Sequence, residues 1–127
     1  MSNKKGFTLV EIMIVVAIIA LLAAIAIPNL LRAKISANDA LAKGTLRSLS
    51  TASETFATTN SGNYPVDITS LTGASPAYIN ASYCGQTISG YFYTCTFGAG
   101  GYSLVAAPVG TAGTTTWTIS TGGVLTP

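Results

Sequence analysis

Hydrophobic residues form an almost unbroken run near the start of the chain. Between Phe7 and Ile27 only Thr8 and Glu11 interrupt the run, and from Ile12 to Ile27 no side chain is polar or charged. A run of about 21 residues is long enough to cross the hydrocarbon core of a bilayer as a helix. The pattern therefore predicts a transmembrane helix, with a cleaved secretory signal as the alternative.

Glu11 does not fit either of these simple interpretations. A carboxylate within a bilayer costs about 2.5–3.5 kcal/mol on translocon insertion scales. The hydrophobic region of a signal peptide has no use for an acid. We therefore expect Glu11 to have either a partner or a specific function.

The pattern after the apolar run indicates that the helix continues. Pro28 is expected to kink or locally break it, but residues 29–60 are rich in Ala and Leu and favour helix again. Together the two segments predict a helix of about fifty residues that ends near Gly62 to Pro65. At about 100° per residue the second half has an apolar face, made of Leu31, Ile35, Leu41, Ala42, Leu49, Ala52 and Phe56. The opposite face is expected to carry Arg32, Asp39, Lys43, Arg47 and Glu54.

The last third of the chain changes to the alternation of β-strands. Residues 91–97 place Tyr91, Tyr93 and Cys95 on one face, together with Phe97. Further strands are expected over residues 102–107 and 114–120 and after the turn at 121–123, whereas residues 66–82 show no clear periodicity. The sequence thus predicts an α+β fold, in which one long N-terminal helix packs on an antiparallel sheet of three or four strands.

Composition argues against a catalytic or metal site. The chain has no histidine, only 8% of its residues are charged, and its four acids are spread from Glu11 to Asp67. No pair of carboxylates is spaced to converge in a cleft, so we expect no catalytic residue, metal or cofactor. A calcium site at Asp67 is an alternative to the simpler interpretation of a turn residue. The net charge of +2 gives no reason to expect sequence-specific nucleic-acid binding.

The two cysteines, Cys84 and Cys95, lie in a region rich in Thr, Ser, Gly and Tyr. Their spacing fits no zinc pattern. We interpret them as a disulfide formed in an oxidising compartment. Two unpaired structural thiols are the alternative.

At the start of the chain "KKG" precedes "FTLVEIMIVVAIIALLAAIAIPNL". This N-terminus closely resembles that of type IV pilins and the related pseudopilins of type II secretion. The resemblance implies cleavage after Gly6 by a prepilin peptidase and N-methylation of the new first residue, Phe7. Glu11 is the fifth residue after the cut, where the family has its signature glutamate, and Pro28 matches the family's helix-kinking proline. Thr8 also fits. The implied domains are a leader (1–6), a transmembrane and filament-core helix (7–29), and a globular head (30–127).

In this family the subunit waits in the bacterial inner membrane, and a pilus assembly platform then adds it to an extracellular helical filament of identical copies. Lys4 and Lys5 fit a cytoplasmic leader under the positive-inside rule. Glu11 would pair with the N-terminal amine of Phe7 on a neighbouring copy. Apolar contacts slide easily, whereas a buried charge pair is favourable in one register alone.

The resemblance leaves three functions open. The first is a pilus subunit that supports twitching motility, adhesion or DNA uptake. The second is a periplasmic pseudopilin of type II secretion, and the third is a minor pilin whose head binds a ligand. Major pseudopilins typically carry an acidic, calcium-binding C-terminal loop and often lack a disulfide. This chain has no acid after Asp67 and has a cysteine pair, which favours the pilus.

Overall fold

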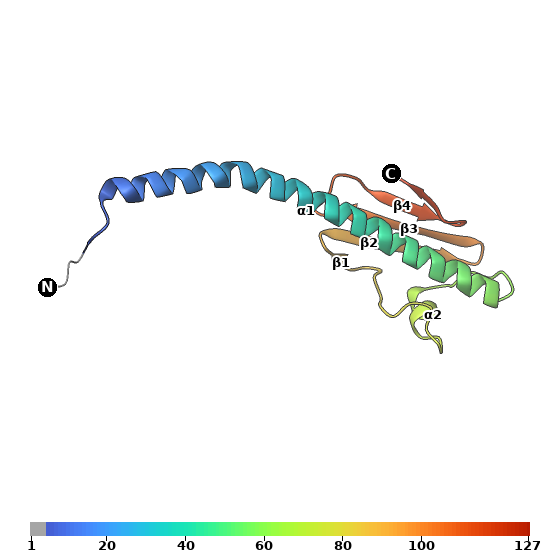
Figure 1. Ribbon diagram of the computed structural model, residues 1–127. Coiled ribbons are helices and arrows are strands. Elements are labelled where there is room, and N and C mark those ends of the chain that lie inside the picture. The colour runs from blue at the N-terminus through green and yellow to red at the C-terminus, as the bar shows by residue number, and fades with distance from the viewer. Residues whose placement is uncertain (1–4) are drawn as a thin grey trace. The chain divides into compact units, whose positions relative to one another are not determined.

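A computed structural model describes residues 5–127 of the chain (Figure 1). The elements follow in the order α1 (Leu9–Thr59), α2 (Ile68–Thr72), β1 (Thr87–Ile88), β2 (Tyr91–Gly98), β3 (Gly101–Pro108), β4 (Trp117–Ser120) and β5 (Val124–Thr126). The fold is α+β, as predicted. The chain divides into two compact units, of which the first ends at Ala33 and the second extends from Lys34 to Pro127. Most of the expected leader, including Lys4, lies outside the described residues.

The first unit consists mainly of the N-terminal part of α1. Its large apolar side chains are exposed throughout, from Phe7 at 85% to Leu31 at 55%. By length and composition α1 can cross a membrane, since its most apolar 18-residue window has a mean hydropathy of 3.0 and none of that window is buried. Pro28 lies inside the helix without ending it.

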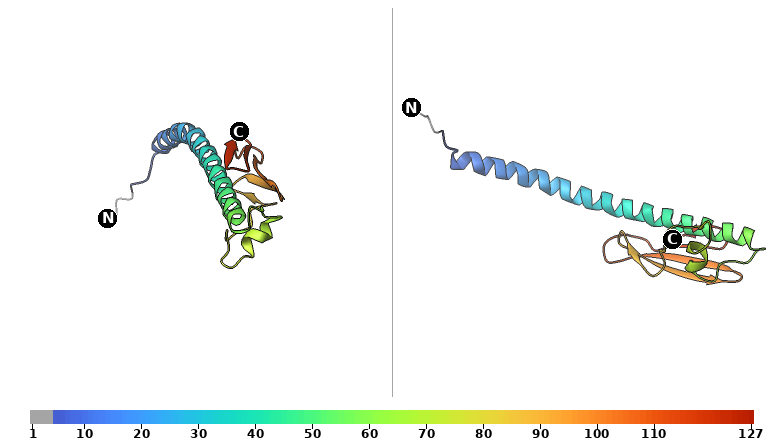
Figure 2. Two further views of the ribbon diagram at one scale, coloured as in Figure 1. Left: turned by 90° about the vertical axis from the view of Figure 1, so that its right-hand side faces the viewer. Right: turned by 90° about the horizontal axis from the view of Figure 1, so that it is seen from below.

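The second unit contains the rest of α1, which lies along one face of the sheet (Figure 2). The helix ends close to the predicted place. Gly62 has a positive φ of 87°, and its N–H bonds back to the carbonyl of Ala57 at 2.8 Å. Glycine adopts this left-handed conformation without the penalty that a Cβ brings, which explains why the helix ends here.

The sheet is antiparallel with the strand order β1-β2-β3-β4-β5. Burial along β2 alternates as predicted, with Tyr91 and Tyr93 fully or almost fully buried and Phe92 exposed. The turn between β2 and β3 follows the predicted "GAGG" sequence, and Gly98 pairs with Gly101. The core forms where this face of the sheet meets α1; its largest fully buried members are Leu46, Leu49, Tyr91, Tyr93, Leu104 and Ile119.

The disulfide prediction is confirmed. Cys84 is bonded to Cys95 with their Cα atoms 5.5 Å apart. The bond ties the segment before β1 to the middle of β2. Two backbone hydrogen bonds beside it join Tyr93 to Gly85 and Gln86, at 2.8 and 3.0 Å.

The number of strands was predicted too low, because the sheet has five strands rather than three or four. The additional strand β1 has two residues, too few to show alternation.

The segment expected to lack periodicity also contains α2, a single five-residue helix whose N-cap is Asp67. Strand β4 begins at Trp117, three residues later than predicted, because Thr114 bonds to a helix side chain instead of a neighbouring strand.

The prediction of which face of α1 covers the sheet was wrong in part. Leu41, expected on the covered face, is 47% exposed. Asp39, Lys43 and Glu54, expected on the opposite face, contact the sheet or its loops. The buried positions of the helix are dominated by small residues: Ala42, Thr45, Leu46, Leu49, Ser50, Ala52, Ser53 and Ala57. Small side chains bring the helix close to the sheet, so long side chains at the edges of this face reach the loops.

Candidate functional site

The first site is the start of α1, where Thr8 and Glu11 form a reciprocal cap. The Thr8 N–H and hydroxyl both donate to Glu11 Oε2 at 2.7 Å, and the Glu11 N–H donates to the Thr8 hydroxyl at 3.2 Å. This is the capping-box arrangement, in which a Thr N-cap and a Glu three residues later satisfy each other's backbone N–H groups. Glu11 therefore starts the helix as well as carrying its charge.

The Glu11 carboxylate retains capacity for another partner. All its side-chain hydrogen bonds within residues 5–127 go to Oε2 and come from Thr8, so Oε1 accepts none there. The carboxylate borders a small hollow lined by Phe7, Ile12, Ile14 and Val15. A cation that approaches along this apolar surface finds an acceptor already held in place by the cap.

Gly6 immediately precedes this site, and its surroundings do not require glycine. A Cβ added at Gly6 would meet no atom of residues 5–127 within 4 Å, and the φ of Gly6 lies outside the left-handed region. The fold of the chain thus tolerates a side chain here. Among residues 5–127 nothing requires a glycine at this position.

A second site lies in the second unit, where two acids on α1 hold loops of the sheet. Asp39 Oδ2 accepts a hydrogen bond from the Thr114 hydroxyl at 2.9 Å, and Oδ1 accepts from Tyr91 and, at 3.3 Å, from the Thr114 N–H. Next to it, Asn38 Nδ2 donates to the carbonyl of Ala112 at 2.8 Å. Asp39 and Asn38 together hold the loop between β3 and β4 against the helix.

Glu54 holds the other end of the sheet in the same way. Its Oε1 accepts from the Gly122 N–H at 2.8 Å and from the Tyr102 hydroxyl at 2.9 Å, and its Oε2 accepts from the Tyr64 hydroxyl at 3.0 Å. The turn between β4 and β5 is thereby joined to the helix. Between the two acids, Lys43 Nζ lies 4.6 Å from the centre of the Trp117 ring, within range of a cation–π contact.

These contacts change the acidity of both carboxyls. Burial acts to raise the pKa of Asp39, but the hydrogen bonds from Tyr91 and Thr114 outweigh it, so the pKa falls below 3.8. Burial also acts to raise the pKa of Glu54, but the hydrogen bonds from Gly122 and Tyr102 outweigh it and lower the pKa below 4.5. Burial and the neighbouring Asp39 carboxylate raise the pKa of Tyr91 to about 12. At neutral pH the site therefore holds two carboxylates and a neutral tyrosine.

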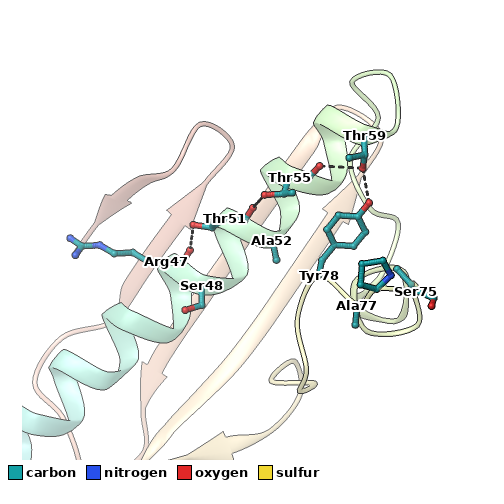
Figure 3. Close-up of a pocket in the computed structure, with 11 residues that line it drawn as sticks. Arg47, Ser48, Thr51, Ala52, Thr55, Thr59, Ser75, Ala77 and Tyr78 are labelled. Atoms are coloured by element: carbon teal, nitrogen blue, oxygen red, sulfur yellow. Dashed lines mark hydrogen bonds between the residues drawn. The ribbon is translucent and has the colours of Figure 1, made fainter.

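The second unit also has an open groove of about 850 Å³ between α1 and the loop after α2 (Figure 3). Arg47 lies at one end of the groove and Tyr78 at the other, with Ala52 between them. This groove could not be predicted from the sequence, because the loop at residues 74–78 shows no periodicity that would place it beside the helix. Within residues 5–127 there is no cluster of three or more His, Cys, Asp or Glu side chains that could hold a metal.

Similarity to known proteins indicates the family of the chain. The family described as "Prokaryotic N-terminal methylation motif" matches residues 1–27. The chain is also 36% identical to the type IV wide pilus major component PilA4 of Thermus thermophilus over 121 residues, which cover 95% of this chain and 84% of that protein. The chain belongs to the type IV pilin family.

Two other type IV pilins are similar to less than half of the chain. The type IV major pilin protein PilA of Myxococcus xanthus is 52% identical over 54 residues, which are 42% of this chain and 24% of that protein. A fimbrial protein of Moraxella nonliquefaciens is 51% identical over 55 residues, which are 40% of this chain and 36% of that protein. No solved structure matches the chain significantly. Family membership confirms the resemblance identified from the N-terminal sequence.

Proposed function

We propose that this chain is the structural subunit of a type IV pilus filament and polymerises through its N-terminal helix. Similarity along nearly the whole chain to a major component of a type IV pilus supports the proposal most strongly. This similarity also favours a pilus over a pseudopilin fibre of type II secretion. The filament would support motility, adhesion or DNA uptake.

The subunit would first be processed at its N-terminus. In this proposal a prepilin peptidase removes residues 1–6, and Phe7 becomes the methylated first residue. The match to a methylation motif supports this step. The open space around Gly6 supports it too, because the glycine is dispensable for the fold and would serve the peptidase instead.

The exposed apolar helix then has two successive environments. Residues 7–29 would lie in the bacterial inner membrane before assembly and in the core of the extracellular filament afterwards, with residues 30–127 as the head. The assembly platform would move the subunit between them. Every large apolar side chain of this segment is free to contact lipid or neighbouring helices.

Glu11 would fix the axial register of each new subunit. The unoccupied Oε1 would accept a hydrogen bond from the Phe7 amine of a neighbour, while Oε2 remains in the capping box. A shift by one helical turn would leave both charges buried and unpaired, which costs several kcal/mol. Thr8 would contribute by holding the carboxylate in a fixed orientation.

The proposal is tested first on fibres sheared from the cell surface. The intact mass and first residue of their subunits should correspond to a chain that begins with methylated Phe7. Gly6→Val should leave an uncleaved chain in the membrane. If the sheared fibres lacked this chain, or contained it with residues 1–6 attached, the proposal would be wrong.

Two substitutions at Glu11 separate its charge from its capping role. Glu11→Gln keeps an acceptor for the Thr8 N–H and preserves the capping box, since Gln also occupies this position in such boxes. Glu11→Ala removes both. If charge sets the register, both variants should be cleaved, remain in the membrane and form almost no fibres. Normal fibres from Glu11→Gln would show that the cap is sufficient and that charge pairing has no role.

A further inference from the structure

The three acids of the second unit differ in how many of their carboxylate oxygens accept hydrogen bonds. Asp39 and Glu54 place both of their oxygens in contacts within the unit. Asp67 differs, because its Oδ1 accepts all three of its hydrogen bonds, from the Thr69 hydroxyl and from the N–H and hydroxyl of Ser70. Over residues 5–127 its Oδ2 accepts none. Asp67 is therefore an ionised acid on the surface of the head with an oxygen available to another molecule.

An exposed apolar side chain stands beside this acid. Val66 is 73% exposed, more than any other large apolar side chain between Lys34 and Pro127. We call Val66 and Asp67 together the knob. An apolar tip next to a free carboxylate oxygen is a suitable feature for insertion into an apolar hollow with a cation at its edge.

The groove described above has these properties, and we call it the Arg47 groove. Ala52, Ala77 and Pro76 contribute apolar atoms to it, and the Tyr78 ring closes one end (Figure 3). Arg47 lies at the other end. In the part of the chain that the structure describes, its guanidinium donates no hydrogen bond, and the Thr51 hydroxyl bonds to the backbone carbonyl of Arg47 instead of its side chain.

Three hydroxyls along the helical wall of the groove already use their one donor within the helix. Those of Thr51, Thr55 and Thr59 each donate to a carbonyl of their own helix, at 2.9, 2.7 and 3.2 Å (Figure 3). A ligand that needs to accept hydrogen bonds from these hydroxyls would have to compete with the helix carbonyls. The helical wall thus suits an apolar side chain better than a ligand that needs hydrogen-bond donors there.

The knob and the groove share no residue. Asp67 borders a different hollow, beside the disulfide and the end of β2. When two different patches of one chain are complementary, copies join head to tail, and repetition of that contact produces a ring or an open helix. A filament subunit needs a contact of this type.

We propose that in the filament Val66 of one subunit occupies the Arg47 groove of another, where Asp67 pairs with Arg47. This inference rests on the proposed function and adds to it a contact between heads. The apolar helices would hold the fibre together, and the knob would set how neighbouring heads are rotated against each other.

Cross-linking within fibres tests the contact directly. The variant Ser48→Cys/Val66→Cys places one thiol in the groove and one on the knob, while the native cysteines are held in their disulfide. A short bifunctional thiol reagent should then give a ladder of covalent oligomers from sheared fibres. Each single variant should give none, because it lacks the second thiol of the pair. As a matched control, Ser48→Cys/Val124→Cys uses another exposed valine outside the groove and should also give none.

The charge pair is tested by substitutions that leave the fold intact. Asp67→Asn keeps a good N-cap for α2, and Arg47→Gln keeps a long polar side chain. Each should reduce the sheared fibre per cell by about twofold to fivefold, as expected for loss of one surface ion pair per contact. The double variant should be no worse than the single variants. Lys34→Gln removes a charge from the same helix outside the groove and should have no effect.

Fibres of normal yield that give no ladder, or the same ladder with Val124→Cys, would overturn the knob-and-groove contact and leave the proposed function intact. Failure of the unaltered chain to appear in any fibre would refute the proposed function, and this inference with it.

Discussion

Two acids on α1 show how single residues hold the sheet of the head against the helix. Asp39 and Glu54 are fifteen positions apart on α1, and each accepts hydrogen bonds from a backbone N–H in a sheet loop and from one or two tyrosine hydroxyls. A hydrogen bond to a charged group contributes about 1.5–3 kcal/mol. The acids that looked like solvent-exposed surface therefore hold both ends of the sheet against the helix.

The stability of the head should consequently depend on pH. The folded head lowers the pKa of Asp39 below 3.8 and that of Glu54 below 4.5. The unfolded chain then binds protons more readily than the folded one, so acid favours unfolding. The contribution of these acids is complete above about pH 5, and it is lost as the pH falls through 4.5 and 3.8 toward the folded values.

Thermal unfolding of the detergent-solubilised chain, followed by the circular dichroism of its tyrosines, measures this loss. The unfolding temperature should fall between pH 5 and pH 3. Asp39→Asn/Glu54→Gln should be less stable at pH 7 by about 2–4 kcal/mol and should have a flatter pH profile. An unchanged profile in the double variant would show that the two acids do not hold the loops.

At the level of elements, the disulfide compensates for a short edge strand. Strand β1 has two residues, and the disulfide joins Cys84, which lies just before β1, to Cys95 of β2. A disulfide that closes a loop of about ten residues stabilises by roughly 3 kcal/mol. Cys84→Ser/Cys95→Ser should therefore loosen β1 and its neighbouring segment first. Limited proteolysis should cut the variant within residues 80–90, and equal protease resistance of both proteins would contradict this role.

The loop between β3 and β4 depends on a glycine for a different reason. A Cβ at Gly113 would come within 2.2 Å of the Tyr91 hydroxyl and 2.5 Å of its ring. Tyr91 is fully buried and held by Asp39, so it has little freedom to move away. Gly113→Ala should destabilise the head by about 1–3 kcal/mol through overpacking.

Gly100→Ala is the matched control for this effect. A Cβ at Gly100 meets no atom within 4 Å, and its φ lies outside the left-handed region. Its unfolding temperature should equal or slightly exceed that of the unaltered chain. Equal stability of the two variants would mean that Tyr91 has room to shift.

The same elements show what sequence alone could predict. The long helix, β2 and the hairpin follow local rules, because their apolar period or turn residues lie within a few positions of one another. The inward face of α1 does not follow such rules. Its Ala, Ser and Thr side chains give a weak apolar stripe, and the loop residues that bond to Asp39 and Glu54, Thr114 and Gly122, lie more than sixty residues away. The groove was equally hidden, since it forms between a helix and a loop with no periodic pattern.

At the scale of the whole molecule, the two units gain stability in different ways. The second unit buries a core of its own, built from Leu46, Leu49, Tyr91 and Tyr93 among others. The apolar side chains of the first unit have no such core and remain exposed. Only another molecule, lipid or a further copy, can cover them.

A charge placed in the middle of the apolar segment should affect membrane insertion and fibre assembly differently. In Ile18→Lys, eleven Leu, Ile and Val side chains remain between Leu9 and Ile27. On insertion scales they favour the membrane by roughly 3–7 kcal/mol, whereas a central Lys costs about 2.5–3.5 kcal/mol. The variant should therefore be cleaved and remain in the alkali-resistant membrane fraction.

Assembly of this variant should nevertheless fail. A lysine in a bilayer can extend toward the interface, but between packed helices of a fibre it would be buried without a carboxylate in reach. Removing such a charge from water without a partner costs several kcal/mol per subunit. Sheared fibre should be almost absent, while Ile18→Leu should give a normal yield. Normal fibres from Ile18→Lys would mean that this part of the helix faces water in the filament, because a lysine tolerated at full yield must keep its hydration.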